Sequence, residues 1–218
     1  MPRLVWDQIG EKRYETGVDR GVVFPFVGGA YATGEAWNGL TGVSEAPSGA
    51  EPTPLYANNK KYMDLMSDEQ FGMTITAYTF PDGFAQCLGC KDLAKGLRLT
   101  QQERSTFGMT YRTLIGNDTE KNAYGYKIHI VYGATAKPSQ KDSKTVNESP
   151  EAIEMSWECS TTPIDVPGFK PTAHIEINSK DIDAAKLKAI EDLLYGTESQ
   201  ESTLPTIEEL IELMEIAG

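Results

Sequence analysis

Hydrophobic and polar residues alternate with a period of two along several segments between positions 71 and 177. Successive side chains of a strand point to opposite faces, so this period predicts strands rather than helices. The alternating segments are 71–78, 107–112, 125–134, 153–159 and 172–177. Each segment has one apolar and one largely polar face, which is typical of antiparallel sheets with one face in water. The pattern therefore predicts a mainly β fold with a minor α content.

Weaker signals extend this prediction toward the N-terminus. Residues 21–26 (GVVFPF) predict a short strand that Pro25 confines to a sheet edge or a bend. Residues 36–45 predict a strand interrupted by glycines. Residues 1–20 mix apolar and charged residues without a clear period, so we expect an N-terminal arm. Its apolar residues, Trp6 among them, need burial in the chain's own core or against a neighbouring subunit.

A long stretch from 46 to 68 contains three prolines and no periodic pattern, and it predicts an irregular loop. Loops longer than about 12–15 residues are usually functional or disordered. A disordered linker would be poorer in aromatic residues and methionine. We therefore expect an ordered loop that docks on a partner. Its candidate interaction residues are Leu55, Tyr56, Tyr62, Met63 and Leu65.

Two helices are predicted near the C-terminus, and a short helical turn is predicted at 81–88. The first helix spans 181–195, with an apolar stripe and Gly196 after its last turn. The second begins at the capping box Thr206-Ile-Glu-Glu. Because a polar segment separates the two helices, residues 197–218 predict a detachable C-terminal arm. Leu210 and Leu213 on this arm are candidate interaction residues.

The composition indicates a soluble globular protein with one domain, at 21–196, and two terminal arms. Hydrophobic residues make up 39% and charged residues 24% of the chain. No run approaches the roughly 20 apolar residues that cross a membrane. The first ten residues lack the apolar stretch of a signal peptide, so we expect synthesis in a cytoplasm and no membrane partner.

The acidic residues gather at one end of the chain. Residues 151–218 contain 15 of the 32 acidic residues but only 4 of the 20 basic ones. Tight binding of nucleic acid needs clustered cations that displace counterions from phosphate. No basic cluster is larger than a pair such as Lys60-Lys61. The sequence therefore argues against a tight DNA-binding protein and leaves passive contact with DNA open.

The three cysteines offer little chemistry. Cys87 and Cys90 have the spacing of a redox pair or of half a zinc site. Structural zinc usually takes four ligands, and a thioredoxin-like pair expects a βαβ setting. The chain lacks a second ligand pair and that setting. We therefore expect a coincidental spacing or a local clamp rather than a metal or redox site.

No catalytic constellation emerges from the remaining polar residues. His129 and His174, the only histidines, fall on the predicted polar faces of their strands and are expected to be solvated. No GxSxG elbow or phosphate-binding loop is present. We therefore expect no enzyme activity, no cofactor and no metal. The polar faces carrying Glu154, Glu158 and Glu176 meet either bulk solvent or a cavity that an oligomer shares.

Five long stretches resemble the major tail proteins, or tail-tube proteins, of siphophages and related prophages. They are LVWDQIGEKRYETGVDRGVVFP, AWNGLTGVSEAPSGAEPTPLYANNKKY, TFGMTYRTLIGND, GYKIHIVYGA and SPEAIEMSWECSTTPIDVPGFKPTAHIEI. They are distributed over nearly the whole chain, from residue 4 to residue 177. The sequence departs from the family pattern at Cys87 and Cys90, where polar or acidic residues are more usual.

The resemblance implies an antiparallel β-sandwich or barrel-like fold with one flanking helix. It implies that six copies form a ring whose inner sheets make a continuous barrel, and that rings stack into the tail tube of the virion. The loop at 46–68 and the terminal arms would bridge rings. Partners would be the chain itself and other tail proteins, such as the tape measure and tail completion proteins. DNA would pass through the lumen without specific binding, and Glu154, Glu158 and Glu176 are the candidate lumen residues.

The sequence leaves two alternative functions open. The chain could be a related connector or effector-delivery tube protein, in which case assembly would stop at short rings or serve another apparatus. Less compatible with the residues is a small CxxC metal or redox protein, which thiol substitutions would test.

Overall fold

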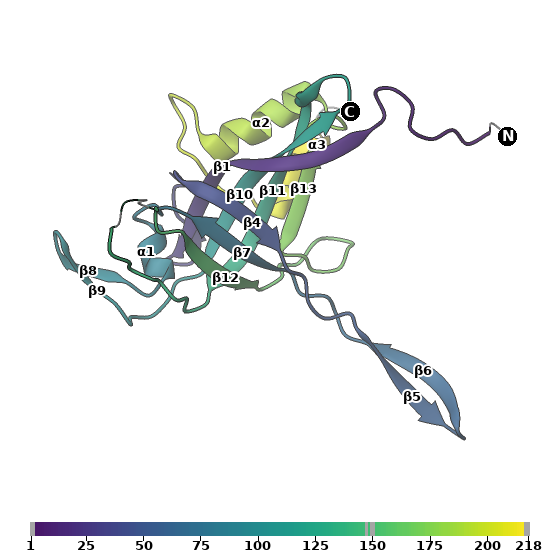
Figure 1. Cartoon of the computed structure of the whole chain (residues 1–218), viewed down its shortest axis with the longest axis horizontal. Helices are drawn as coiled ribbons and strands as arrows, with labels where there is room; N and C mark the ends of the chain where they lie inside the picture. Colours follow the sequence, from purple (N-terminus) through teal and green to yellow (C-terminus); the bar gives the residue numbers. More distant parts are fainter. Residues whose placement is uncertain (1–2, 147, 149–150, 216–218) are drawn as a thin grey trace.

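The computed structural model describes residues 3–146, 148 and 151–215. Its main element is a nine-stranded antiparallel sheet with the order β2-β1-β10-β11-β12-β7-β4 (Figure 1). In addition β13 pairs with β11, and β3 pairs with β1. The strands are β1 (Arg13–Val27), β2 (Ala30–Tyr31), β3 (Glu35–Ala36), β4 (Leu40–Glu45), β7 (Gly72–Ala77), β10 (Phe107–Asn117), β11 (Lys121–Ala136), β12 (Met155–Thr161) and β13 (His174–Asn178). The prediction of a mainly β, antiparallel fold is confirmed.

The main sheet curls around a first core. This core contains side chains from both ends of the strand order, including Val23 of β1, Met109 of β10, Ile75 of β7 and Trp157 of β12. A hydrogen bond of 2.7 Å from the Trp37 backbone N–H to the Gly21 carbonyl extends the pairing of β3 with β1, just before the chain enters β4. The hydrogen-bonded order of the described strands nevertheless ends at β4, and they form no closed barrel.

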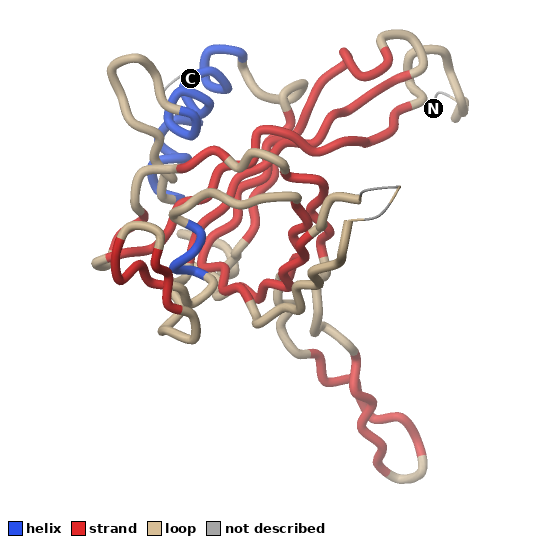
Figure 2. The backbone as a smooth tube through the Cα atoms, turned by 60° about the vertical axis from the view of Figure 1, so that its left-hand side comes forward, coloured by secondary structure: helices blue, strands red, loops and turns tan. Residues whose placement is uncertain are grey.

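The two C-terminal helices cover the other face of β1, β11 and β13, as Figure 2 shows from a second direction. Helix α2 (Ala184–Tyr195) begins at Asp183, whose carboxylate accepts hydrogen bonds from two backbone N–H groups. Helix α3 (Ile207–Glu215) begins with the predicted capping box. The second core lies between these helices and the sheet, and it contains Ile128, Ile130 and Ile190. Among the described residues no helix is both long enough and apolar enough to cross a membrane.

The middle strands are buried on both faces, which corrects the expectation of one wet face per strand. Residues 128–132 of β11 and 107–111 of β10 are all buried. Alternation still holds, because odd and even positions face different cores. The outer strands β7 and β12 keep a single buried face, as predicted.

The N-terminal boundary also differs from the prediction. Strand β1 begins at Arg13 and pairs with β10 through Pro25, so residues 13–20 belong to the sheet. Two register shifts near Asp19 interrupt the pairing of β1 with β10. Because of these shifts, residues 13–20 do not show the two-residue alternation by which a strand is recognised in the sequence. Only the segment before Arg13 remains an arm.

The predicted irregular loop at 46–68 is a β-hairpin. Strands β5 (Pro52–Ala57) and β6 (Lys60–Met66) pair with each other and project away from the main sheet (Figure 1). Asn58 and Asn59 form its turn, both with positive φ, a conformation that asparagine tolerates better than most residues. A second projecting hairpin, β8 (Lys91–Ala94) with β9 (Leu97–Leu99), follows the one-turn helix α1 (Phe84–Cys87).

The C-terminal segment is attached rather than detachable. Leu204, Ile207 and Leu210 are buried in the second core, together with residues of α2 and β11. The Tyr132 hydroxyl donates a buried hydrogen bond of 2.9 Å to the Pro205 carbonyl. The intervening polar segment reverses direction and returns the chain to the sheet. Residues 216–218 of the predicted arm lie outside the described residues.

Candidate assembly surfaces and a histidine–glutamate cluster

The projecting hairpin β5–β6 carries an apolar face that nothing in the described chain covers. Leu55 lies opposite Met63, and Thr53 lies opposite Leu65. Directly paired residues share one face of a sheet. The side chains of Leu55, Met63 and Leu65 are 38%, 47% and 51% exposed. These three predicted interaction residues therefore form one apolar strip.

The two tyrosines of the hairpin lie nearer its turn and are more exposed. Tyr56 and Tyr62 are 71% and 73% exposed. They alternate with Leu55 and Met63 along their strands, and alternate residues point to opposite faces. Both faces of the hairpin thus present large side chains to solvent.

The segment before β1 is a second exposed apolar element. Trp6 is exposed, and so are its neighbours Leu4, Val5 and Ile9. In Figure 1 this segment extends away from the sheet on a different side from the hairpin. A backbone N–H of Gly10 donates a hydrogen bond to the Asp118 carboxylate, which ties the end of the segment to the β10–β11 turn.

A third exposed element was missed in the sequence. Leu93, Leu97 and Leu99 of the β8–β9 hairpin are all exposed. The alternation around Lys95-Gly96 is a hairpin signal, but the segment is short and lies beside the CxxC motif. It adds an apolar projection to the two that were predicted.

Helix α3 does not provide the exposed contacts expected of it. Leu210 is buried in the second core, and Leu213 is partly buried against the same core. The structure uses both residues to attach the helix to its own sheet.

The outward face of β4, β7 and β12 is polar. Glu158 lies opposite Thr74, and Ser156 lies opposite Thr76. Glu154 accepts a hydrogen bond from Thr41, and Glu158 pairs with Lys137. Two of the three lumen candidates therefore lie along one continuous polar surface.

Glu176, the third lumen candidate, does not lie on this polar surface. It lies on β13 opposite His129 of β11, and its carboxylate is 3.1 Å from the Lys127 ammonium group. One ligand atom from each of four side chains lies within 4.8 Å of the others, and these side chains are Glu45, His129, His174 and Glu176. We call this group the histidine–glutamate cluster.

The expectation that both histidines are solvated is wrong. His129 is 1% exposed and His174 is half-buried. His129 Nδ1 lies 3.1 Å from His174 Nε2 and 3.5 Å from Glu45 Oε1. The polar-face assignment failed because both faces of β11 are covered.

Aromatic rings hold the two imidazoles in place. The Tyr111 ring stacks on His129 at 4.5 Å, and the Phe71 ring stacks on His174 at 4.4 Å. Burial lowers the pKa of both histidines below the ordinary value, because a desolvated imidazolium is costly. The sequence spacing of 45 residues gave no signal that the two histidines would meet.

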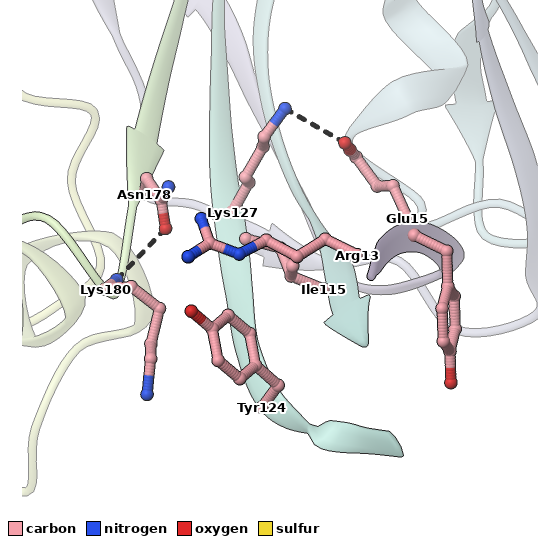
Figure 3. Close-up of a pocket in the computed structure, with 8 residues that line it drawn as sticks. Arg13, Glu15, Ile115, Tyr124, Lys127, Asn178 and Lys180 are labelled. Atoms are coloured by element: carbon pink, nitrogen blue, oxygen red, sulfur yellow. Dashed lines mark hydrogen bonds and ion pairs between the residues drawn. The ribbon is translucent and has the colours of Figure 1, made fainter. Parts of the chain in front are cut away.

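Beside the cluster is a cavity of about 280 Å³ (Figure 3). Its cations already have partners. Arg13 and Lys180 lie over the Tyr124 ring, and Lys127 lies 2.9 Å from Glu15. The arrangement is a set of satisfied charges around an open surface cavity, and it contains no nucleophile paired with a base.

The cysteines do not form a reactive pair. All three are free, and Cys87 and Cys159 are buried. Burial raises the pKa of each of these two thiols to about 12, so both stay protonated and poorly nucleophilic near neutral pH. Within the described residues, no cysteine joins a group able to hold a metal ion.

No known family model matches this chain, and no curated protein matches it.

Proposed function

We propose that this chain is a structural subunit that assembles with copies of itself into rings, and that the rings stack into a tube of the kind found in long-tailed phages. The observation that carries the proposal is the apolar hairpin β5–β6, which projects from the sheet with every residue exposed. The occupant of this surface is a second copy of the chain.

An isolated two-stranded hairpin is marginally stable in water. The strip of Leu55, Met63 and Leu65 contacts no described part of the core. Fully burying one such side chain contributes about 1.5–3 kcal/mol. Burying the exposed halves of all three would contribute on the order of 3 kcal/mol per hairpin, repeated at every subunit of a ring.

The sheet edges favour a copy of the same chain as the partner. Among the described strands, β4 pairs on one side only, and the opposite end of the order is the two-residue β2. Open edges recruit further strands. An edge-to-edge contact between different surfaces of identical chains is heterologous, and such contacts give rings or filaments.

The polar surface of β4, β7 and β12 fits the inner wall of such a ring. Glu154 would place negative charge along it, and Glu158 would form with Lys137 a pair without net charge. A wall without excess positive charge gives DNA phosphates nothing to bind. Each subunit would then contribute its curled sheet to the barrel-like wall of the ring, with α2 on the face of the sheet that points away from the lumen.

Electron microscopy of the concentrated, purified protein tests the proposal. We expect rings and tubes from the unmodified chain. A double variant, Leu55→Ser with Met63→Ser, should retain its far-UV circular dichroism spectrum and lose stacking. The matched control is Asp64→Ser, which changes an exposed residue of the same strand and removes only the exposed ion pair with Lys61.

The electron micrographs distinguish three other cases. Rings that never stack would favour a connector protein over a tube protein. Tubes that form equally well from the double variant would remove the hairpin from the contact. A strictly monomeric chain at high concentration would refute the proposal.

A further inference from the structure

The hydrogen bonds around His129 determine which of its nitrogens carries the proton. The Thr113 hydroxyl donates to a Glu15 carboxylate oxygen at 2.7 Å, and it lies 2.9 Å from His129 Nε2. A hydroxyl has one hydrogen to donate, and an ionised carboxylate has none. His129 Nε2–H must therefore donate to the Thr113 oxygen. A neutral His129 then presents a bare lone pair at Nδ1.

That lone pair faces two other electron-rich groups. Nδ1 of His129 is 3.1 Å from Nε2 of His174 and 3.5 Å from the Glu45 carboxylate. Lone pairs at these distances need a proton or a cation between them. His174 can supply the proton from Nε2, but its half-buried ring can also carry that proton on Nδ1. In the second tautomer, two nitrogen lone pairs face each other beside a carboxylate, and nothing lies between them to compensate their repulsion.

The distance between the two nitrogens allows a metal ion after one imidazole turns. As they stand, the two rings lie within 3° of parallel with centroids 5.3 Å apart, and the two nitrogens point at each other as in an N–H···N hydrogen bond. Zinc binds histidine nitrogen at about 2.0–2.1 Å, so two nitrogens on a tetrahedral ion lie roughly 3.3 Å apart. The observed nitrogen–nitrogen distance of 3.1 Å is close to that value. Nitrogen and carboxylate oxygen together form a donor set that zinc and its neighbours in the first transition row accept.

The local charge is also that of a site for a divalent cation. Three carboxylates surround the imidazoles, from Glu15, Glu45 and Glu176. One ammonium group, that of Lys127, lies 2.9 Å from Glu15 and 3.1 Å from Glu176. Three negative charges against one positive charge leave two negative charges uncompensated.

Supporting groups orient the ligands. The Tyr111 hydroxyl donates to Glu45 Oε1 at 2.9 Å, and Thr113 accepts from His129 as described. Metal-binding histidines and carboxylates commonly have such outer partners, which fix the tautomer and the orientation of the ligand.

We propose that one divalent transition-metal ion of the zinc class binds to the histidine–glutamate cluster, namely Glu45, His129, His174 and Glu176. The ligands come from β4, β11 and β13, and β4 is not hydrogen-bonded to either of the other two. The ion would cross-link the end of the sheet to its middle. Glu45 is the last residue of β4, at the base of the projecting hairpin, so the ion would also anchor that base.

The test is metal binding by the full chain after dialysis against a chelator. Zn²⁺ is titrated by calorimetry and Co²⁺ by visible absorption. We expect one ion per chain and a four-coordinate Co²⁺ spectrum without a thiolate charge-transfer band. His174→Gln and Glu176→Gln should each weaken binding by more than about tenfold, since losing even an outer partner costs 10–100-fold. Thr113→Val removes the outer partner of His129 and the hydrogen bond to Glu15 but no ligand, so it should weaken binding less than either ligand variant.

Two controls separate this site from other ligands. Glu198→Gln removes an exposed carboxylate in the loop after α2, and Cys90→Ser removes the half-buried thiol. Neither should change the affinity. The proposal is wrong if the chain binds neither ion at a one-to-one ratio, if both ligand variants bind as tightly as the unmodified chain, or if Cys90→Ser abolishes binding. Glu176 is exposed, so its variant keeps the test valid should His174→Gln unfold.

Discussion

The attachment of helix α3 to its own sheet can be tested with Leu210→Ala. Leu210 is 6% exposed and belongs to the second core with Leu187, Ile190 and Leu194. Truncating a buried leucine costs about 2–5 kcal/mol, depending on how far the site can collapse. Because Ile211 and Leu213 beside it are only partly buried and the helix can move toward the sheet, we expect the lower half of that range, about 2–3 kcal/mol. Alanine favours helix formation at least as well as leucine, so the loss would come from packing.

Equilibrium unfolding in urea, followed by circular dichroism, measures this cost. Assembly would stabilise the folded chain, so both proteins should carry the Leu55→Ser and Met63→Ser changes. Urea slopes for small proteins are about 1–3 kcal/mol per molar and rise with size. The midpoint should therefore fall by roughly 1 M for Leu210→Ala.

Met214→Ala is the matched control. Met214 lies on the same helix and is 46% exposed, and exposed substitutions usually change stability by less than about 0.5 kcal/mol. If Leu210→Ala and Met214→Ala unfold at the same urea concentration, α3 is not part of the folded core and its leucines would again be candidates for contacts between subunits.

Three further predictions concern the inside of the subunit. Thr110→Val should stabilise the fold by about 1 kcal/mol in the same urea assay, because the buried Thr110 hydroxyl has no hydrogen-bond partner within the described structure; a loss of stability would show that the hydroxyl is satisfied. Asp183→Ala should cost about 1 kcal/mol by removing the N-cap of α2, and an unchanged midpoint would contradict that role. In the native protein near pH 8, a thiol reagent should modify Cys90 first, because Cys87 and Cys159 are buried with a pKa of about 12 and remain protonated; three equally fast thiols would disprove their burial.

Local sequence rules determined much of the secondary structure. The two-residue period located β7 and β12 with the correct buried face, because each of these strands has a single covered side. The capping box located the start of α3, since caps act over three or four residues. The start of α2 was predicted at 181, and the helix begins three residues later because Asp183 is its cap. The mixture of prolines and large apolar residues at 46–68 correctly suggested an ordered segment, although its hairpin pairing was not recognised.

Only the tertiary structure decided whether each face of a helix or strand is buried or exposed to solvent. Nothing near Leu210 in the sequence shows whether the apolar stripe of its helix packs on its own sheet or on another subunit. Leu210 is a core residue because residues 197–203 turn the chain back toward the sheet. His129 alternates like a solvated residue, yet the curling of the sheet buries it and brings His174 and Glu45 to it from separate strands. Burial and the convergence of ligands depend on how distant segments pack, and the sequence pattern of one strand contains no information about the layer that will cover it.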